Sequence, residues 1–77
     1  MATAYVLINC DIGKNQSTIE SLKHLASVKE IHKTFGAYDI VAKLEHEEKS
    51  KLRDMITKGI RQIDSIRSTL TLMTTQK

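Results

Sequence analysis

Apolar residues along this chain follow two spacings, and the order of these spacings restricts the fold more than any other feature of the sequence. They recur at every second position from Ala4 to Ile12, which predicts a strand. From about Asn15 to Ala26 they recur at every third or fourth position, which predicts a helix. Residues Ser17 to Glu20 have the spacing of a capping box at the start of this helix.

The rest of the chain gives two more strands, a second helix and a last strand. Val28 to Phe35 and Tyr38 to His46 are strand-like, and the Gly-Ala pair between them predicts a short hairpin. Helical spacing returns from about Glu48 to Gln62. Ile66 to Thr74 alternates again, with Ile66, Leu70 and Leu72 on one side and Thr69, Thr71 and Met73 on the other. The order β-α-β-β-α-β predicts an α+β fold of the ferredoxin-like type, a four-stranded antiparallel sheet with two helices on one face.

Residues 1–77 form a single domain, because the chain is too short for a second core. A domain of this size buries only about 60% of its unfolded surface, so we expect a disulfide, a metal or a partner to support it. The lone Cys10 cannot form an intrachain disulfide and is read as a small buried hydrophobe. No Cys/His cluster has zinc-site spacing, and the three histidines are scattered, so no metal site is predicted. A protein partner is therefore the remaining means of stabilising the domain.

The second face of the predicted sheet indicates which partner this is. With both helices on one face, the other face keeps a set of apolar residues: Tyr5, Leu7, Ile31, Phe35, Val41 and Met73. An exposed apolar patch of this extent usually marks an interface. We therefore expect a homodimer in which two sheets pack face to face as a sandwich or barrel. The alternative is a monomer with a partly apolar surface.

Charge and hydropathy restrict the function classes. The net charge is +3, and basic and acidic residues are interleaved, which is typical of solvated helix faces rather than of a nucleic-acid patch. No apolar run reaches membrane-span length, and the N-terminus has no basic leader, so we expect a cytoplasmic protein without a membrane partner. Binding of RNA to the sheet would need stacking aromatic residues in an RNP-like motif, which does not occur.

The stretch "TFGAYDIV" places an acid between two apolar segments. Gly36 lets the backbone approach a ligand closely, and its neighbours can present N–H groups to an α-carboxylate. Asp39 could pair with an α-ammonium group, so the stretch suits a zwitterion, with hydroxyl groups of Ser68, Thr69 or Thr71 adding hydrogen bonds. The competing interpretation is that Asp39 only satisfies an N–H group of the turn.

"KTFGAYDIVAKLE" and "IRSTLTLMTTQK" resemble the two signature stretches of the effector-binding domain of the Lrp/AsnC transcription regulators, also called the RAM domain. The resemblance covers nearly the whole chain. It implies a ferredoxin-like module that forms homodimers through its sheets and assembles further, commonly into octamers. It also implies an amino-acid effector, bound at contacts between dimers without a cofactor. Carried over by position, the ligand contacts would be Gly36, Ala37, Tyr38, Asp39, Thr69 and Thr71.

Full-length members of that family carry a helix-turn-helix before this domain, and no such segment precedes Met1 in the sequence. The resemblance therefore implies a stand-alone form that does not bind DNA directly and could modulate full-length Lrp/AsnC regulators. A small enzyme of the dimeric α/β-barrel type is the alternative. We expect a binding module rather than an enzyme, because no Cys/His or Ser/His pairing, and hence no catalytic residue, can be identified.

Overall fold

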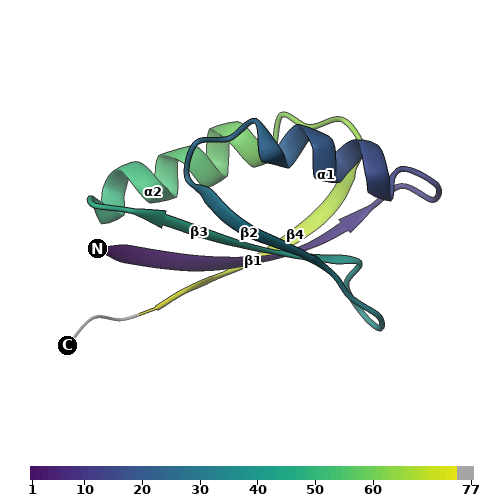
Figure 1. Ribbon diagram of the computed structural model, residues 1–77, viewed down its shortest axis with the longest axis horizontal. Helices are drawn as coiled ribbons and strands as arrows, with labels where there is room; N and C mark the ends of the chain where they lie inside the picture. The colour runs from purple at the N-terminus through teal and green to yellow at the C-terminus, as the bar shows by residue number, and fades with distance from the viewer. Residues whose placement is uncertain (75–77) are drawn as a thin grey trace.

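The computed structural model describes residues 1–74, in which two helices lie over one face of an antiparallel sheet (Figure 1). The elements are β1 (Ala2–Cys10), α1 (Asn15–Lys23), β2 (Val28–Lys33), β3 (Ile40–His46), α2 (Lys49–Met55), which continues as a π-helical segment (Ile56–Ile60), and β4 (Ile66–Met73). The predicted β-α-β-β-α-β order and the ferredoxin-like fold are confirmed.

The core lies between the helices and the sheet, whose strand order is β2-β3-β1-β4. Alternate residues of β1 are buried because successive side chains of a strand point to opposite faces. The core residues are Ala2, Ala4, Val6, Ile8, Cys10, Ile19, Leu22, Ile40, Ala42, Leu44, Leu52, Ile56 and Ile60. Most of the core residues that the sheet contributes lie on the central strands β1 and β3. Ile8 and Ile40, which pair where the ladder between these two strands ends, are both fully buried.

Three predictions for the first strand and the first helix are wrong. β1 ends at Cys10 rather than at Ile12, whose side chain lies in the following loop and is 95% exposed. Helix α1 ends at Lys23 rather than near Ala26. The capping box does not form, because the helix begins two residues before Ser17, whose hydroxyl donates to the carbonyl of Lys14 at 3.1 Å.

A β-bulge changes the alternation of β4 from the predicted one. Asn9 of β1 faces Ser68, but the next residue, Cys10, faces Ile66, so Arg67 is an extra residue without a partner in the ladder. The bulge places Ile66 on the helix side together with Thr69, Thr71 and Met73, which pair with or adjoin the core-facing residues of β1. The predicted grouping of Ile66 with Leu70 and Leu72 is therefore wrong.

The sheet face away from the helices, here called the open face, is uncovered in the single chain (Figure 1). The pairing register gives it an apolar set on β1, β3 and β4: Tyr5, Leu7, Val41, Leu70 and Leu72. Of these, Tyr5, Leu70 and Leu72 are more than a third exposed. Ile31 and Met73, predicted for this face, instead lie on the helix side opposite Ala42 and Ala4, and Phe35 lies beyond the end of β2.

Charged residues occupy the other half of the open face, toward β2. Lys43 Nζ lies 3.6 Å from Glu30 Oε2 and 3.7 Å from Glu45 Oε2. The neighbouring Tyr5, followed by these two carboxylates, raises the pKa of Lys43. A hydrogen bond from His32, and then the charge of Lys43, lower the pKa of Glu30. The open face thus combines an apolar half with a charged half whose acids and base already neutralise one another in part.

Candidate functional site

The β2–β3 connection is longer than the two-residue turn predicted from the sequence. β2 ends at Lys33 and β3 begins at Ile40, so residues 34–39 form a loop. The Thr34 N–H donates to the carbonyl of Asp39 at 2.9 Å, and the Thr34 hydroxyl donates to the carbonyl of Tyr38 at 2.7 Å. Gly36 has a φ of 110°, a conformation that side chains with a Cβ rarely adopt. The wider loop therefore depends on Thr34 at its base and on glycine at its tip.

Asp39 joins this loop to the end of β1. Its N–H donates to the carbonyl of Ile8 at 2.9 Å, which extends the β1–β3 ladder by one contact. Its carboxylate oxygen Oδ2 accepts a hydrogen bond from the Cys10 N–H at 3.1 Å. The second oxygen, Oδ1, accepts no hydrogen bond from residues 1–74. One carboxylate oxygen thus has a structural contact, whereas the other has no hydrogen-bond partner among these residues.

Cys10 lies directly behind this carboxylate. The side chain is buried, and its thiol donates to Asn15 Oδ1 at 2.9 Å and lies 3.8 Å from Asp39 Oδ2. Burial, together with the negative charges of Asp39 and Asp11, raises the pKa of the thiol, while a hydrogen bond with Thr18 acts in the opposite direction. The thiol is therefore held neutral, which makes it a poor nucleophile and confirms its prediction as a small buried residue.

A groove of ≈ 480 Å³ opens beside Asp39, here called the Asp39 groove. It is lined by Asn9, Cys10, Ile12, Asp39, Arg67 and Ser68. These residues come from the end of β1, the loop after it, the loop before β3 and the start of β4, which lie toward one end of the sheet (Figure 1). The groove offers a carboxylate, a guanidinium and neutral hydrogen-bonding groups, so its charges match those of a zwitterion.

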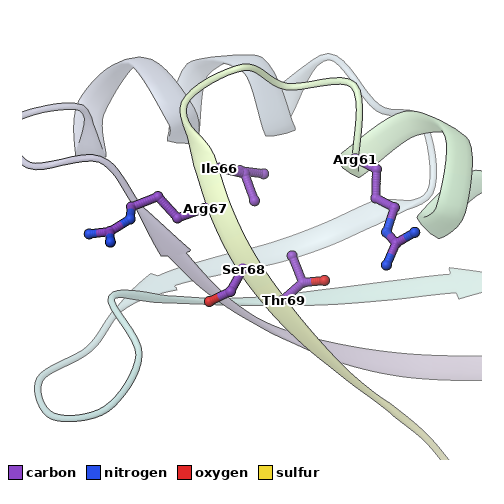
Figure 2. Close-up of a pocket in the computed structure, with 5 residues that line it drawn as sticks. All are labelled: Arg61, Ile66, Arg67, Ser68 and Thr69. Carbon is purple, nitrogen blue, oxygen red and sulfur yellow. The ribbon is translucent and has the colours of Figure 1, made fainter.

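A second hollow, of ≈ 470 Å³, adjoins β4 and is lined by Arg61, Ile66, Arg67, Ser68 and Thr69. Figure 2 shows Arg67 and Ser68 projecting from one side of β4, and Ile66 and Thr69 from the other side, toward Arg61. The two arginines thus lie on different sides of the strand, and only Arg67 also lines the Asp39 groove.

The structure does not gather all the predicted site residues in one place. Asp39 lines the Asp39 groove, whereas Gly36, Ala37 and Tyr38 of the same loop do not. Thr69 and Thr71 pair with Ile8 and Val6, whose side chains face the helices, so within one chain they lie off this groove. Ser68 is the β4 hydroxyl that shares the groove with Asp39.

Sequence reasoning missed Arg67 and Asn9 as candidate site residues. The signal that could have identified Arg67 is the adjacent polar pair Arg67–Ser68, which interrupts the apolar alternation of the last strand. Such an interruption is what a bulge produces, since it inserts one extra residue into the strand.

No group of three or more His, Cys, Asp or Glu side chains within residues 1–74 could hold a metal ion. Within the same residues, none of the helices is long and apolar enough to span a membrane.

Comparison with known proteins agrees with the fold and the motifs. The family model for the Lrp/AsnC ligand binding domain matches residues 3–77. The chain is 32% identical to FFRP-DM1, with a TM-score of 0.92, over 97% of this chain and 100% of that one. It is 31% identical to the hypothetical protein PHS023 from Pyrococcus horikoshii, with a TM-score of 0.92, over 100% and 93% of the two chains.

AsnC from E. coli is similar over only part of its length. The identity is 27% and the TM-score 0.89, over 99% of this chain and 52% of that one. The search among curated proteins found no match.

Proposed function

Because the chain belongs to the Lrp/AsnC ligand-binding domain family, we propose that it is an amino-acid-sensing and oligomerisation module rather than an enzyme. The observation that carries the proposal is the position of the Asp39 carboxylate. Its oxygen Oδ2 is fixed by the Cys10 N–H, while Oδ1 has no partner within residues 1–74 and the side chain lines an open groove. A carboxylate held in this way is oriented before a ligand arrives, which lowers the entropic cost of binding.

The effector in this proposal is an amino acid whose α-ammonium group pairs with Asp39. Hydrogen bonds between charged partners are stronger than neutral ones, so this contact would supply much of the affinity. Gly36, Ala37 and Tyr38 belong to the same loop but do not line the Asp39 groove, so they would contribute backbone contacts only across a subunit contact. Thr69 and Thr71 lie off the Asp39 groove of their own chain, so they would reach an effector only across a subunit contact.

Assembly in this proposal begins with a homodimer formed through the open face. Leu70 and Leu72 are 45% and 50% exposed there, beside the partly exposed Tyr5. Burying such a surface against an identical one stabilises the dimer by about 25 cal/mol for each Å² of apolar area removed from water. Dimers would then associate further, for example into an octamer, which creates the subunit contacts at which the effector binds.

The proposed setting is the cytoplasm, where the protein would sense an amino acid without binding DNA itself. Co-assembly with full-length Lrp/AsnC regulators is the route by which effector binding would reach transcription. The effector would alter both the homo-oligomer and the co-assembly with full-length regulators, because a ligand that binds one state more tightly shifts the equilibrium toward that state.

A thermal-shift screen of the common amino acids tests the proposal. A ligand that binds only the folded state stabilises it by about 2.7 kcal/mol at 100 times its Kd, so Tm should rise with its concentration. We expect at least one amino acid to act in this way, and its α-amide and decarboxylated amine serve as matched controls. A folded, oligomeric protein whose Tm no amino acid changes would contradict the proposed function.

A further inference from the structure

Arg67 owes its position to the bulge in β4. The residues on either side of it, Ile66 and Ser68, face Cys10 and Asn9, so Arg67 has no opposite residue in β1. In a regular strand, Arg67 and Ser68 would project to opposite sides. Here both project to the same side (Figure 2), and both line the Asp39 groove. Bulges often redirect a side chain next to a binding site, which is the effect seen here.

The guanidinium of Arg67 is only weakly engaged by residues 1–74. Its Nε lies 4.0 Å from Asp11 Oδ1, and the two side chains are 66% and 52% exposed. An exposed pair at that distance contributes little, roughly 0–1 kcal/mol. The terminal nitrogens of the guanidinium, which form the fork that recognises carboxylates, make no ion pair with an acid in this part of the chain. Arg67 can therefore turn from Asp11 toward a better anion at small cost.

We propose that Arg67 binds the α-carboxylate of the effector in the groove where Asp39 binds the α-ammonium group. The inference rests on the proposed function and assigns to it a second charged contact. An acid from the β2–β3 loop and a base from β4 that line one groove can hold the two charges of an amino acid at once. The effector class is then restricted to free α-amino acids, since an amide or an amine offers the arginine no anion.

The assignment replaces part of the predicted site. The sequence suggested that N–H groups of the hairpin hold the carboxylate, but Gly36 and Ala37 do not line the Asp39 groove. Arg67 does line it, and guanidinium-carboxylate pairs are frequently bidentate and strong. Asn9 and Ser68, which face each other across β1 and β4, line the same groove and can add neutral hydrogen bonds.

The test compares two arginines on different sides of β4 by calorimetry. The probe is the amino acid that gives the largest thermal shift with the wild-type protein, together with its α-amide. Charged hydrogen bonds contribute about 1.5–3 kcal/mol, so Arg67→Gln should bind the amino acid roughly 10- to 150-fold more weakly. The affinity of Arg67→Lys for the amino acid should fall between those of wild type and Arg67→Gln. Arg61→Gln, which removes the same charge outside the Asp39 groove, should bind within about twofold of wild type.

The amide separates a direct contact from a general loss of charge. Wild type should bind the amide more weakly than the acid by a similar factor, whereas Arg67→Gln should bind acid and amide almost equally. Circular dichroism and light scattering confirm that each variant is folded and assembled.

Equal affinity of Arg67→Gln and wild type for the amino acid would overturn this inference alone, as would a loss seen only with Arg61→Gln. Failure of the wild-type protein to bind any amino acid would overturn the proposed function as well.

Discussion

The N–H group of Cys10 donates to Oδ2 of Asp39 at 3.1 Å, although the two residues are 29 positions apart in the sequence. The hydrogen bond fastens the β2–β3 loop to the end of β1 and leaves Asp39 Oδ1 without a partner among residues 1–74. Asp39 therefore has a structural contact whether or not it binds an effector. A mutational test has to separate these two roles.

Asp39→Asn should lose amino-acid binding with little change in stability. The amide oxygen can still accept the Cys10 hydrogen bond, so Tm should stay within a few degrees of wild type. Removing the charge opposite an α-ammonium group leaves that group unpaired, at a cost of about 2–5 kcal/mol, or some 30- to several-thousand-fold in affinity. Calorimetry with the amino acid found in the screen measures the loss.

Asp39→Ala is the matched variant that removes both roles. By analogy with helix caps, losing the acceptor for Cys10 should cost about 0.5–2 kcal/mol of stability in addition to the loss of binding. The binding role of Asp39 would be contradicted if Asp39→Asn bound the amino acid as tightly as wild type and Asp39→Ala lost stability without losing affinity. Asp39 would then serve only as a hydrogen-bond acceptor in the loop.

Leu72→Glu should convert the proposed dimer into a monomer. Leu72 lies on the open face and is 50% exposed in the single chain, so the proposed interface would have to bury the new carboxylate without a partner. We expect the dimer dissociation constant to rise by at least about 100-fold, which light scattering at micromolar concentration would detect. Ser50→Glu adds the same charge on the exposed side of α2 and should leave the dimer intact. A Leu72→Glu dimer of unchanged stability would place the interface elsewhere.

The thiol of Cys10 should react slowly with iodoacetamide in the folded protein. Burial raises its pKa above 9.0, so the thiolate fraction near pH 8 falls and access requires local opening. We expect alkylation at least about 100-fold slower than in guanidinium-unfolded protein.

The same shift predicts how stability depends on pH. The folded-state pKa of Cys10 lies above the unfolded value of 9.0, so its contribution is present below pH 9.0 and is lost as pH rises through the folded-state value. Cys10→Ala should remove this part of the decline in Tm. Rapid alkylation of the native protein at pH 8 would contradict both expectations.

Gly36→Ala should destabilise the protein through the strained backbone conformation at this position rather than through a steric clash. The added Cβ would meet no atom within 4 Å, but a φ of 110° is strained for any residue with a side chain. A cost of about 1–3 kcal/mol lowers Tm by roughly 4–8 °C for each kcal/mol in a domain of this size.

Gly59→Ala is the contrasting variant for that measurement. Its Cβ would lie 3.3 Å from Leu25 Cδ2, the end of a flexible side chain, and alanine is the better helix former by about 0.8–1.0 kcal/mol. We expect an unchanged or higher Tm. A larger loss of Tm for Gly59→Ala than for Gly36→Ala would show that the loop tolerates another conformation.

The spacing of apolar residues was enough to predict the fold, because burial acts on every turn of a helix and on every second residue of a strand. The alternation of Ala4, Val6 and Ile8 could be read directly, since all three are fully buried against the helices. The second helix was also predicted closely, because Leu52, Ile56 and Ile60 share one buried face.

Features that depend on single backbone contacts could not be predicted in this way. Ile12 continues the alternation of β1 in the sequence, yet the strand ends two residues earlier, where Asp39 binds the Cys10 N–H. Ile31 and Met73 were assigned to the wrong face because the face that a strand residue occupies depends on the pairing register, and a shift of one residue reverses it. The motif drew attention to Asp39 but not to Arg67, which approaches it only through the fold.

The bulge at Arg67 also has a consequence for how this domain can change in evolution. Deleting the single codon for Arg67 would leave Ser68 opposite Asn9 and Ile66 opposite Cys10, so the two strands would pair as a regular ladder. We expect such a deletion to preserve the sheet while removing a charged group from the groove. Gain or loss of one codon, rather than a series of substitutions, would then be enough to interconvert a domain that carries this arginine and one that does not.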